Sequence, residues 1–204
     1  MSDTETSETI LDAAEELFAK QGFAATTIKQ IGAAAGVNPA LTYYYFDNKE
    51  KLYRAVLGRL IGTIATQGAR QLDPAPAPDQ AVRALVGVQS ETLIGRPTLP
   101  RILGRELVDH ELSHASDHLA HLSATLFSRL CELIRAGQEA GTFRDDMDAR
   151  FAAISVISLV PYFHIARPVM GILLESGPDG PDVETMRAYG RHVAEFALAA
   201  LAAR

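Results

Sequence analysis

Between residues 27 and 49 the sequence gathers side chains that can donate hydrogen bonds to phosphate groups or meet the edges of nucleic-acid bases. Hydroxyl and ammonium groups bind phosphate oxygens, whereas a short hydroxyl can also reach a base edge and a methyl group can pack against thymine. We therefore expect this stretch to bind double-stranded DNA. The candidate contacts are Thr27, Lys29, Asn38, Pro39, Ala40, Thr42, Tyr43, Tyr44 and Lys49.

These side chains need two short helices and a tight turn to hold them at a groove. Thr26 or Thr27 can cap a helix that runs to about residue 35. Asn38 can cap a second helix, with Pro39 in its first turn, where a missing N–H is harmless. Gly36 lies between them and allows the sharp turn. The pattern predicts a helix-turn-helix, whose second helix enters the major groove.

The second helix carries four consecutive aromatic residues, Tyr43 to Phe46. Four successive helical residues point in four directions, so they cannot all belong to the core. Helical spacing turns Val37, Leu41 and Tyr45 toward the core. We expect Thr42, Tyr43 and Tyr44 to face solvent or DNA.

The chain as a whole is acidic, with a net charge of −6 over 204 residues. Nonspecific binding to nucleic acid depends on lysine and arginine displacing counterions, so a general polyanion binder is excluded and any DNA contact must be local. Residues 22–54 supply that local charge, with the cations Lys29, Lys49, Lys51 and Arg54 against Asp47 and Glu50.

Cellular location is indicated by the cysteine usage and by the apolar segments. Cys131 is the only cysteine, which excludes an intramolecular disulfide and indicates a reducing compartment. The polar, acidic N-terminus does not resemble a signal peptide. The apolar run 152–174 is interrupted by His164, Arg167 and two prolines, so we expect no membrane span and a cytoplasmic protein.

The hydrophobic periodicity is helical throughout, and 48% hydrophobic residues can bury a substantial core. We predict an all-α fold of about nine helices, with a DNA-binding headpiece at 1–48 and a helical ligand-binding and dimerisation body at 49–204. Residues 73–79 read as a stiff connector and 177–182 as a turn. The expected helices lie at about 7–21, 26–35, 38–46, 49–72, 79–95, 99–109, 113–140, 146–174 and 182–203.

The segment GFAATTIKQIGAAAGVNPALTYYYFDNKEKL, residues 22–52, resembles the DNA-binding motif of TetR-family transcriptional regulators. The matching parts are the threonine pair, the I-x-x-I-x-x-x-A-G-V run, the Y-x-Y-F signature and the N-K-E-x-L that follows. The resemblance implies an all-helical homodimer in the bacterial cytoplasm. It also implies that the protein represses transcription until a small molecule, bound in the body, releases it from its operator.

The resemblance further implies roles for individual positions. Thr27, Tyr43, Tyr44 and Lys49 match phosphate contacts, while Asn38, Pro39, Ala40 and Thr42 match contacts to base edges. Two positions depart from the family pattern. Asn38-Pro39 replaces a serine followed by a variable polar residue, and Thr42 replaces an apolar residue. The operator sequence therefore cannot be read from this helix.

The final helix is apolar on more than one stripe, with Met186, Gly190 and Val193 on one side and Tyr189 and Phe196 on another. A helix that is apolar around much of its circumference is buried on two sides. Packing against the body covers one side, and we expect a second copy of the chain to cover the other. The resemblance implies the same four-helix dimer interface.

The segment around Pro161 and Pro168 is the candidate small-molecule site. An apolar cavity with a few polar groups is the usual form of such sites. The identity of the effector is not readable, although an arginine could meet an acidic group. The alternative is a kinked dimer helix whose polar face lies in water. The predicted ligand-binding residues are Arg105, Ser158, Phe163, His164, Arg167 and Met170.

Histidines at positions 110, 114, 118 and 121 offer an alternative function, a metal-responsive regulator. In one continuous helix His110, His114, His118 and His121 would share a face, and imidazoles four residues apart bind divalent metals. Ser113 and Ser116 can each cap a helix, which would divide the set. We therefore expect ordinary solvated histidines, no metal site and no cofactor.

Catalysis is not indicated anywhere in the chain. The sequence contains no nucleophile paired with a base, no phosphate-binding loop and no metal-ligand motif of adequate spacing. We therefore predict a regulator and not an enzyme. An activator in place of a repressor stays open.

Overall fold

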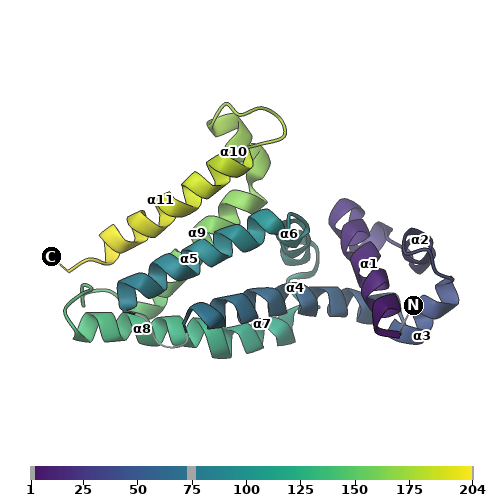
Figure 1. Cartoon of the computed structure of the whole chain (residues 1–204), viewed down its shortest axis with the longest axis horizontal. Helices are drawn as coiled ribbons and strands as arrows, with labels where there is room; N and C mark the ends of the chain where they lie inside the picture. The colour runs from purple at the N-terminus through teal and green to yellow at the C-terminus, as the bar shows by residue number, and fades with distance from the viewer. Residues whose placement is uncertain (1–2, 73–76, 204) are drawn as a thin grey trace. The chain divides into compact units, whose positions relative to one another are not determined.

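The computed structural model describes residues 3–72 and 77–203 of the chain, which divides into two compact units. The first unit comprises Met1–Gly62 and Thr98–Ala120, and the second comprises Thr63–Pro97 and His121–Arg204. Each unit is helical (Figure 1). The predicted functional boundary after residue 48 stays a prediction.

The first unit contains α1 (Asp3–Ala25), α2 (Ile28–Ala34), α3 (Pro39–Phe46), α6 (Thr98–His110) and the first part of α4 (Lys49–Gln71). Its core forms because apolar residues recur every three or four positions along α1 and meet those of α4. Phe18 and Tyr53 are buried there with ring centroids 4.8 Å apart in an edge-to-face arrangement.

An ion-pair network joins α1 to α4 in the first unit. Arg59 lies 3.2 Å from Glu8, 2.7 Å from Asp12 and 2.6 Å from Glu15. Glu15 is buried and also accepts a hydrogen bond from the Thr98 hydroxyl at 2.5 Å. The acidity of the N-terminal segment is therefore partly structural, because its carboxylates neutralise the half-buried guanidinium of Arg59.

The second unit contains α5 (Pro78–Gly95), α8 (Ser128–Glu139), α9 (Ala149–Ile165), α10 (Arg167–Leu173) and α11 (Val183–Leu201). Figure 1 shows α5, α9 and α11 running side by side, and all three pairs are in contact. Gly190 allows the close approach of α11 to α5, since a Cβ there would lie 2.5 Å from the Ser90 hydroxyl oxygen.

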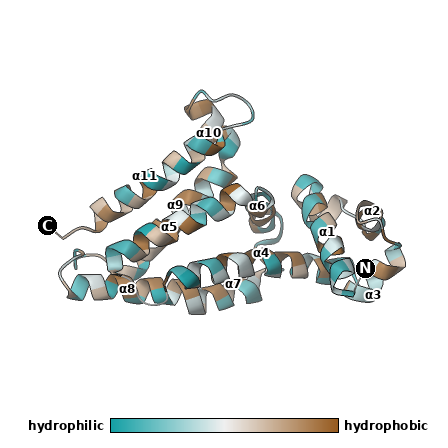
Figure 2. Cartoon of the chain, in the orientation of Figure 1, coloured by the Kyte–Doolittle hydropathy of each residue, from teal (hydrophilic) through white to brown (hydrophobic). Residues whose placement is uncertain are grey.

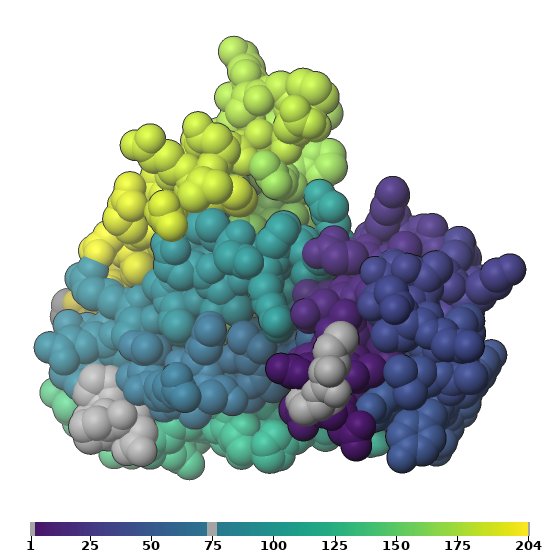
Figure 3. Space-filling model, turned by 45° about the vertical axis from the view of Figure 1, so that its right-hand side comes forward, coloured from purple at the N-terminus to yellow at the C-terminus, as the bar shows by residue number. Residues whose placement is uncertain are grey.

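Large apolar side chains remain exposed on the last three helices of the second unit. We call this set the α9–α11 apolar surface. Figure 2 shows hydrophobic residues along these helices, and Figure 3 shows atoms of α10 and α11 at the molecular surface. Single exposed apolar residues are ordinary, whereas so many on adjoining helices are typical of an interaction site. The set comprises Phe151, Ile154, Tyr162, Ile165, Val169, Ile172, Leu173 and Phe196.

The all-α prediction is confirmed over the described residues, and most helix limits agree within two residues. The rod predicted at 113–140 is α7 (Ser116–Leu122), a π-helical turn (Ser123–Phe127) and α8 in succession. If that rod is counted as one helix and the bent pair α9–α10 as another, the described residues 3–72 and 77–203 contain nine helical segments. Positions 73–76 of the predicted connector lie outside the described residues.

Both limits of the first helix, predicted at 7–21, and the start of the helix predicted at 146–174 were wrong, because α1 spans Asp3–Ala25 and α9 begins at Ala149. The first helix begins at Asp3 and not near Ser7, because Asp3 and Glu5 favour the positive end of the helix dipole and Thr6 is buried. Helix α9 continues through Pro161, and the break falls at Ala166, where the two helix axes differ by 83°.

Membrane insertion is not supported by any single described helix. Taken one at a time, none combines the length and the hydropathy of a span, and α9 with α10 do so only jointly across their bend.

Candidate nucleic-acid interface

The turn between α2 and α3 places the second helix of the motif. Gly36 has φ 67°, the left-handed conformation that glycine adopts at low cost. The Val37 amide donates to the Gly32 carbonyl at 2.9 Å and the Gly36 amide donates to the Ala33 carbonyl at 3.3 Å. These two bonds make a Schellman motif, which satisfies the last carbonyls of α2 and redirects the chain.

Gly32 brings the two helices together, a role that the sequence analysis missed. A Cβ at this position would lie 3.1 Å from the Val37 carbonyl oxygen and 3.3 Å from the Pro39 nitrogen. Around Gly36, by contrast, a Cβ would meet nothing within 4 Å. Gly36 therefore supplies the conformation and Gly32 supplies the space. A glycine inside a helix, where it costs stability, was the available signal.

The start of α2 is fixed by a capping box. The Thr27 hydroxyl accepts from the Gln30 amide at 3.2 Å, and the Gln30 side chain accepts from the Thr27 amide at 2.9 Å. This reciprocal pair satisfies two helix-end donors. Thr27 is exposed, as predicted, but its hydroxyl also donates to the Gln30 side chain at 3.0 Å. A phosphate would have to share or displace that bond.

Helix α3 begins as predicted, with Asn38 at the N-cap and Pro39 in the first turn. The Asn38 side chain accepts from the Ala40 amide at 2.9 Å. Ala40, Tyr43 and Tyr44 then follow at helical spacing and form one exposed face. The exposed fractions are 52% for Tyr43 and 75% for Tyr44, so both phenol hydroxyls are on side chains open to solvent.

The prediction that Thr42 faces the DNA is wrong. Thr42 is fully buried, and its hydroxyl oxygen has no hydrogen-bond partner among the described residues. Helix α3 is rotated from the predicted orientation by about one residue, so Thr42, Tyr45 and Phe46 face inward. A long-range contact helps to set this rotation, because the Tyr45 hydroxyl donates to Asp3 at 3.0 Å.

The cations near α3 differ in their availability. Lys51 and Arg54 form ion pairs with Asp47 and Glu50 one helical turn away, which reduces their charge toward a polyanion. Lys49 donates to the Phe23 carbonyl at 3.0 Å, and its ammonium lies 4.3 Å from the centre of the Phe23 ring.

An ammonium has three donors, so Lys49 keeps capacity for a further acceptor while its position is fixed. Lys29 is exposed on α2. Lys29 and Lys49 are therefore the lysines of this surface for which the described residues supply no carboxylate partner.

The predicted ligand-binding residues occupy different environments. Phe163 and His164 are buried on α9, and burial, followed by the charge of Arg167, lowers the pKa of His164. The guanidinium of Arg167 donates to the Pro181 carbonyl at 3.0 Å. Both His164 Nε2 and Arg167 Nε are buried without a hydrogen-bond partner in the described ranges.

The other three predicted ligand residues are less enclosed. Ser158 is exposed and donates to the Ser155 carbonyl at 3.3 Å, Met170 is half-buried, and Arg105 belongs to the first compact unit, on α6. A cleft of about 340 Å³ is present elsewhere in the second unit, and none of the six predicted residues lines it. It is lined by Gln67, Arg70, Gln71, Val88, Glu91 and Thr92.

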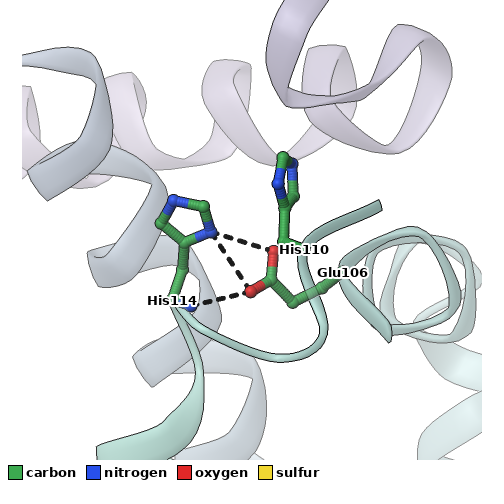
Figure 4. A group of neighbouring side chains, drawn as sticks. All are labelled: Glu106, His110 and His114. Atoms are coloured by element: carbon green, nitrogen blue, oxygen red, sulfur yellow. Dashed lines mark hydrogen bonds and ion pairs between the residues drawn. The ribbon is translucent and has the colours of Figure 1, made fainter. Parts of the chain in front are cut away.

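The four-histidine face does not form. Helix α6 ends at His110, a turn follows, and α7 begins at Ser116, so the histidines are divided as the capping serines indicated. His110 and His114 instead gather around Glu106 (Figure 4).

Fold and site together define a class of protein, an all-helical regulator that presents a helix-turn-helix to DNA. Two family profiles match the chain: bacterial regulatory proteins of the tetR family over residues 10–56, and the tetracyclin repressor-like C-terminal domain over residues 78–196. The chain belongs to the TetR family of DNA-binding transcriptional regulators.

Individual relatives agree with this assignment. The chain is 35% identical over 172 residues to the HTH-type transcriptional repressor NicS of Pseudomonas putida, covering 83% of this chain and 80% of that one. A tetR-family regulator from Rhodococcus RHA1 has the same fold, with a TM-score of 0.80, 22% identity and full coverage of both chains. FadR from Bacillus subtilis, solved in complex with stearoyl-CoA, has a TM-score of 0.74 at 18% identity, covering 95% of this chain and 98% of that one. These relatives are regulators and not enzymes.

Proposed function

We propose that the chain is a homodimeric repressor that places α3 of each copy in the major groove of an operator and leaves it when a small molecule binds the second unit. The exposed face of Ala40, Tyr43 and Tyr44 carries the DNA-binding part of this proposal. A tyrosine hydroxyl on either side of a methyl group suits a helix that touches phosphates at its edges and bases along its centre.

The phosphate contacts proposed are those of Tyr43, Tyr44, Thr27, Lys29 and Lys49. The base contacts proposed come from the start of α3, where Asn38, Pro39 and Ala40 are exposed or half-buried. Asn38 uses its side-chain oxygen to cap the helix, which leaves its amide group as the donor that could meet a base. Thr42 takes no part, because it is buried.

The α9–α11 apolar surface supports the dimer. Ile172 is 79% exposed, Phe151 66% and Phe196 58%, and burial of such side chains is the main favourable term in association. A two-fold dimer also suits an acidic protein with few free lysines, because two headpieces on two half-sites compensate for modest affinity in each.

Buried His164 and half-buried Arg167 support an effector site with a polar end. Each has an unpartnered nitrogen, which leaves donor capacity beside the stacked rings of Phe163 and Tyr189, whose centroids are 4.0 Å apart. An acid attached to an apolar body satisfies both features. FadR of Bacillus subtilis was solved with stearoyl-CoA, which combines a long apolar chain with anionic groups.

The proposed mechanism is a shift between two body conformations. The effector favours a conformation in which the two headpieces are spaced wrongly for successive major grooves, and the operator favours the other. Binding of effector and operator is then mutually antagonistic by linkage.

A two-stage experiment tests the function. Operators are first selected from random double-stranded DNA with the full-length protein, and compounds that raise its melting temperature are then identified, beginning with long-chain acyl-CoA. We expect an effector at saturation to weaken operator binding at least about fivefold, the lower end of common coupling energies. Equal operator affinity with and without the bound compound contradicts the release mechanism, whereas failure to select any DNA contradicts the DNA-binding function itself.

A further inference from the structure

A buried carboxylate and two imidazoles meet at the end of α6, and the DNA-binding role does not use them. Glu106 is fully buried, and its carboxylate oxygens both lie 3.2 Å from His114 Nδ1. The His110 ring lies beside them, with its centroid 4.8 Å from that of His114 (Figure 4). One ligand atom from each of the three residues lies within 4.8 Å of the other two.

The turn that makes this cluster is built from unfavourable residues. Glu111 and Leu112 have φ values of 51° and 64°, a region that side chains other than glycine rarely adopt. The Leu112 amide donates to the Glu106 carbonyl at 3.1 Å and the Ser113 amide to the His110 carbonyl at 2.9 Å. This tight reversal brings His114 back to a carboxylate eight residues earlier, and such conformations concentrate at functional sites.

The donor set selects a class of ion. Two imidazoles and one carboxylate suit zinc and its neighbours among the divalent transition metals, whereas calcium and magnesium require more oxygen ligands. Zinc–nitrogen bonds of about 2.05 Å place neighbouring ligands of a tetrahedral ion roughly 3.3 Å apart. The hydrogen-bond distance of 3.2 Å between His114 Nδ1 and the Glu106 carboxylate is compatible with this spacing, and the group of three, whose ligand atoms lie within 4.8 Å of one another, would contract around the ion.

Surrounding groups hold the three residues in position. The His114 amide donates to Glu106 Oε1 at 2.8 Å, which fixes the carboxylate, and a metal ion would replace the contact of 3.2 Å between Oε2 and His114 Nδ1. The phenol of Tyr53 lies near the same carboxylate, and burial, followed by the negative charge of Glu106, raises the pKa of that phenol. Partners of this kind orient metal ligands and strengthen metal binding.

We propose that Glu106, His110 and His114 form a binding site for one divalent transition metal ion of the zinc class, with a solvent molecule completing the coordination. The site differs from the four-histidine face considered from the sequence, since His118 and His121 lie outside the group. Metal binding here does not depend on the proposed DNA-binding function.

Cobalt(II) is the probe that reports both binding and geometry. Untagged full-length protein is stripped with EDTA, dialysed and titrated with CoCl2. We expect one ion per chain with the intense visible absorption of tetrahedral cobalt, and we expect zinc to displace it. The variants His110→Gln and His114→Gln should bind at least about 100-fold more weakly, since loss of a ligand exceeds the loss of a supporting partner.

The matched controls are His118→Gln and His121→Gln, which should leave both affinity and spectrum unchanged. Circular dichroism and thermal unfolding confirm that each variant is folded, and His110→Gln serves if His114→Gln does not fold, because the His110 ring contributes no hydrogen bond to the cluster as described. The proposal is overturned if cobalt gives no tetrahedral spectrum. It is equally overturned if His110→Gln binds as tightly as wild type, or if a control variant loses the ion.

Discussion

The exposed face of α3 and the α9–α11 apolar surface are open to solvent for opposite physical reasons. On α3 the exposed aromatic residues are tyrosines, whose hydroxyls stay hydrated, so the face is stable in water and can bind and leave a polyanion. On α9 to α11 the exposed large hydrophobic residues are mainly phenylalanine, isoleucine, leucine and valine. Exposure of their apolar side chains to water costs free energy. The first surface suits reversible contact, and the second suits a permanent partner.

The strongest test of this contrast introduces a charge into the apolar surface. Phe196→Glu should convert the proposed dimer to monomer, because an interface centre that must bury a carboxylate loses about 2–4 kcal/mol or more, roughly 30-fold to 1,000-fold in dissociation constant. Sedimentation velocity over a concentration series measures it.

Val108→Glu is the control for that experiment. Val108 is 79% exposed, but it lies on α6 in the first unit and is not part of the α9–α11 apolar surface. This variant should sediment as wild type. If both variants dissociate equally, or neither does, exposure of apolar residues on α9–α11 has no special meaning.

Gly32→Val tests whether close packing of α2 against α3 maintains the polar face. The new side chain meets backbone atoms of Val37 and Pro39, which cannot move aside as a flexible side chain would. We expect a loss of about 1–3 kcal/mol in the free energy of unfolding, measured by urea denaturation.

Gly62→Ala is the comparison, because it should change the free energy of unfolding in the opposite direction. Gly62 lies within α4, and a Cβ there would meet nothing within 4 Å. This substitution should stabilise the protein by about 0.8–1 kcal/mol, the difference in helix propensity. Destabilisation by both changes would mean that the space around Gly32 is not the limiting factor.

Thr42→Val separates the predicted orientation of α3 from the observed one. Valine keeps the shape and removes a buried hydroxyl that lacks a partner in the described part of the chain, so stability should rise by about 1 kcal/mol. Operator affinity should stay the same. A selective loss of operator binding at full stability would restore Thr42 to the DNA-facing side.

Local chemistry explains which parts of this region could be predicted. Asn38 and Gly36 act on backbone groups within a few residues, so cap and turn were readable from the sequence. The rotation of α3 was not, because it depends on packing and on Tyr45 reaching Asp3, 42 positions away. A threonine can lie on either the buried or the exposed face of a helix, and hydrophobic periodicity alone placed Thr42 on the exposed face, where it does not lie.

The second unit was harder to predict for the same reason. Pro161 and Pro168 look equivalent in the sequence, yet α9 continues through the first and α10 begins at the second. In the first unit, the sequence singled out His110 and His114, but the contact between His114 and Glu106 had no local signal, since it depends on Glu111 and Leu112 adopting a conformation that neither residue favours. The ligand-binding assignments stay predictions.

Tyr43→Phe sharpens the claim that the α3 face holds phosphates. Loss of one hydroxyl contact should weaken binding by about 1 kcal/mol, roughly fivefold, on the selected operator and on unrelated duplexes alike, because phosphates carry no sequence information. Fluorescence anisotropy at fixed salt measures both. Tyr162→Phe is the control for loss of a phenol hydroxyl, since Tyr162 is 62% exposed on α9 in the second unit and the variant keeps its apolar ring on the α9–α11 apolar surface. Weakening confined to the operator would identify the hydroxyl as a base contact.

The smallest effect concerns buried His164 and its half-buried neighbour Arg167 in the second unit. The pKa of His164 is lowered, first by burial and then by Arg167. Between pH 6.5 and the lower pKa of the folded protein, the unfolded chain binds a proton that the folded chain resists. The free energy of unfolding therefore has its full value above pH 6.5 and declines as the solution is acidified. Thermal unfolding at pH 7.5 and 5.5 should therefore show a fall in melting temperature that is smaller in His164→Gln. Arg167→Gln should reduce the fall only in part, because burial, the larger cause, remains. If the melting temperature falls equally on acidification in wild type and His164→Gln, protonation of this imidazole does not contribute to the pH dependence of stability. That result would also weaken the case for an acidic effector beside it.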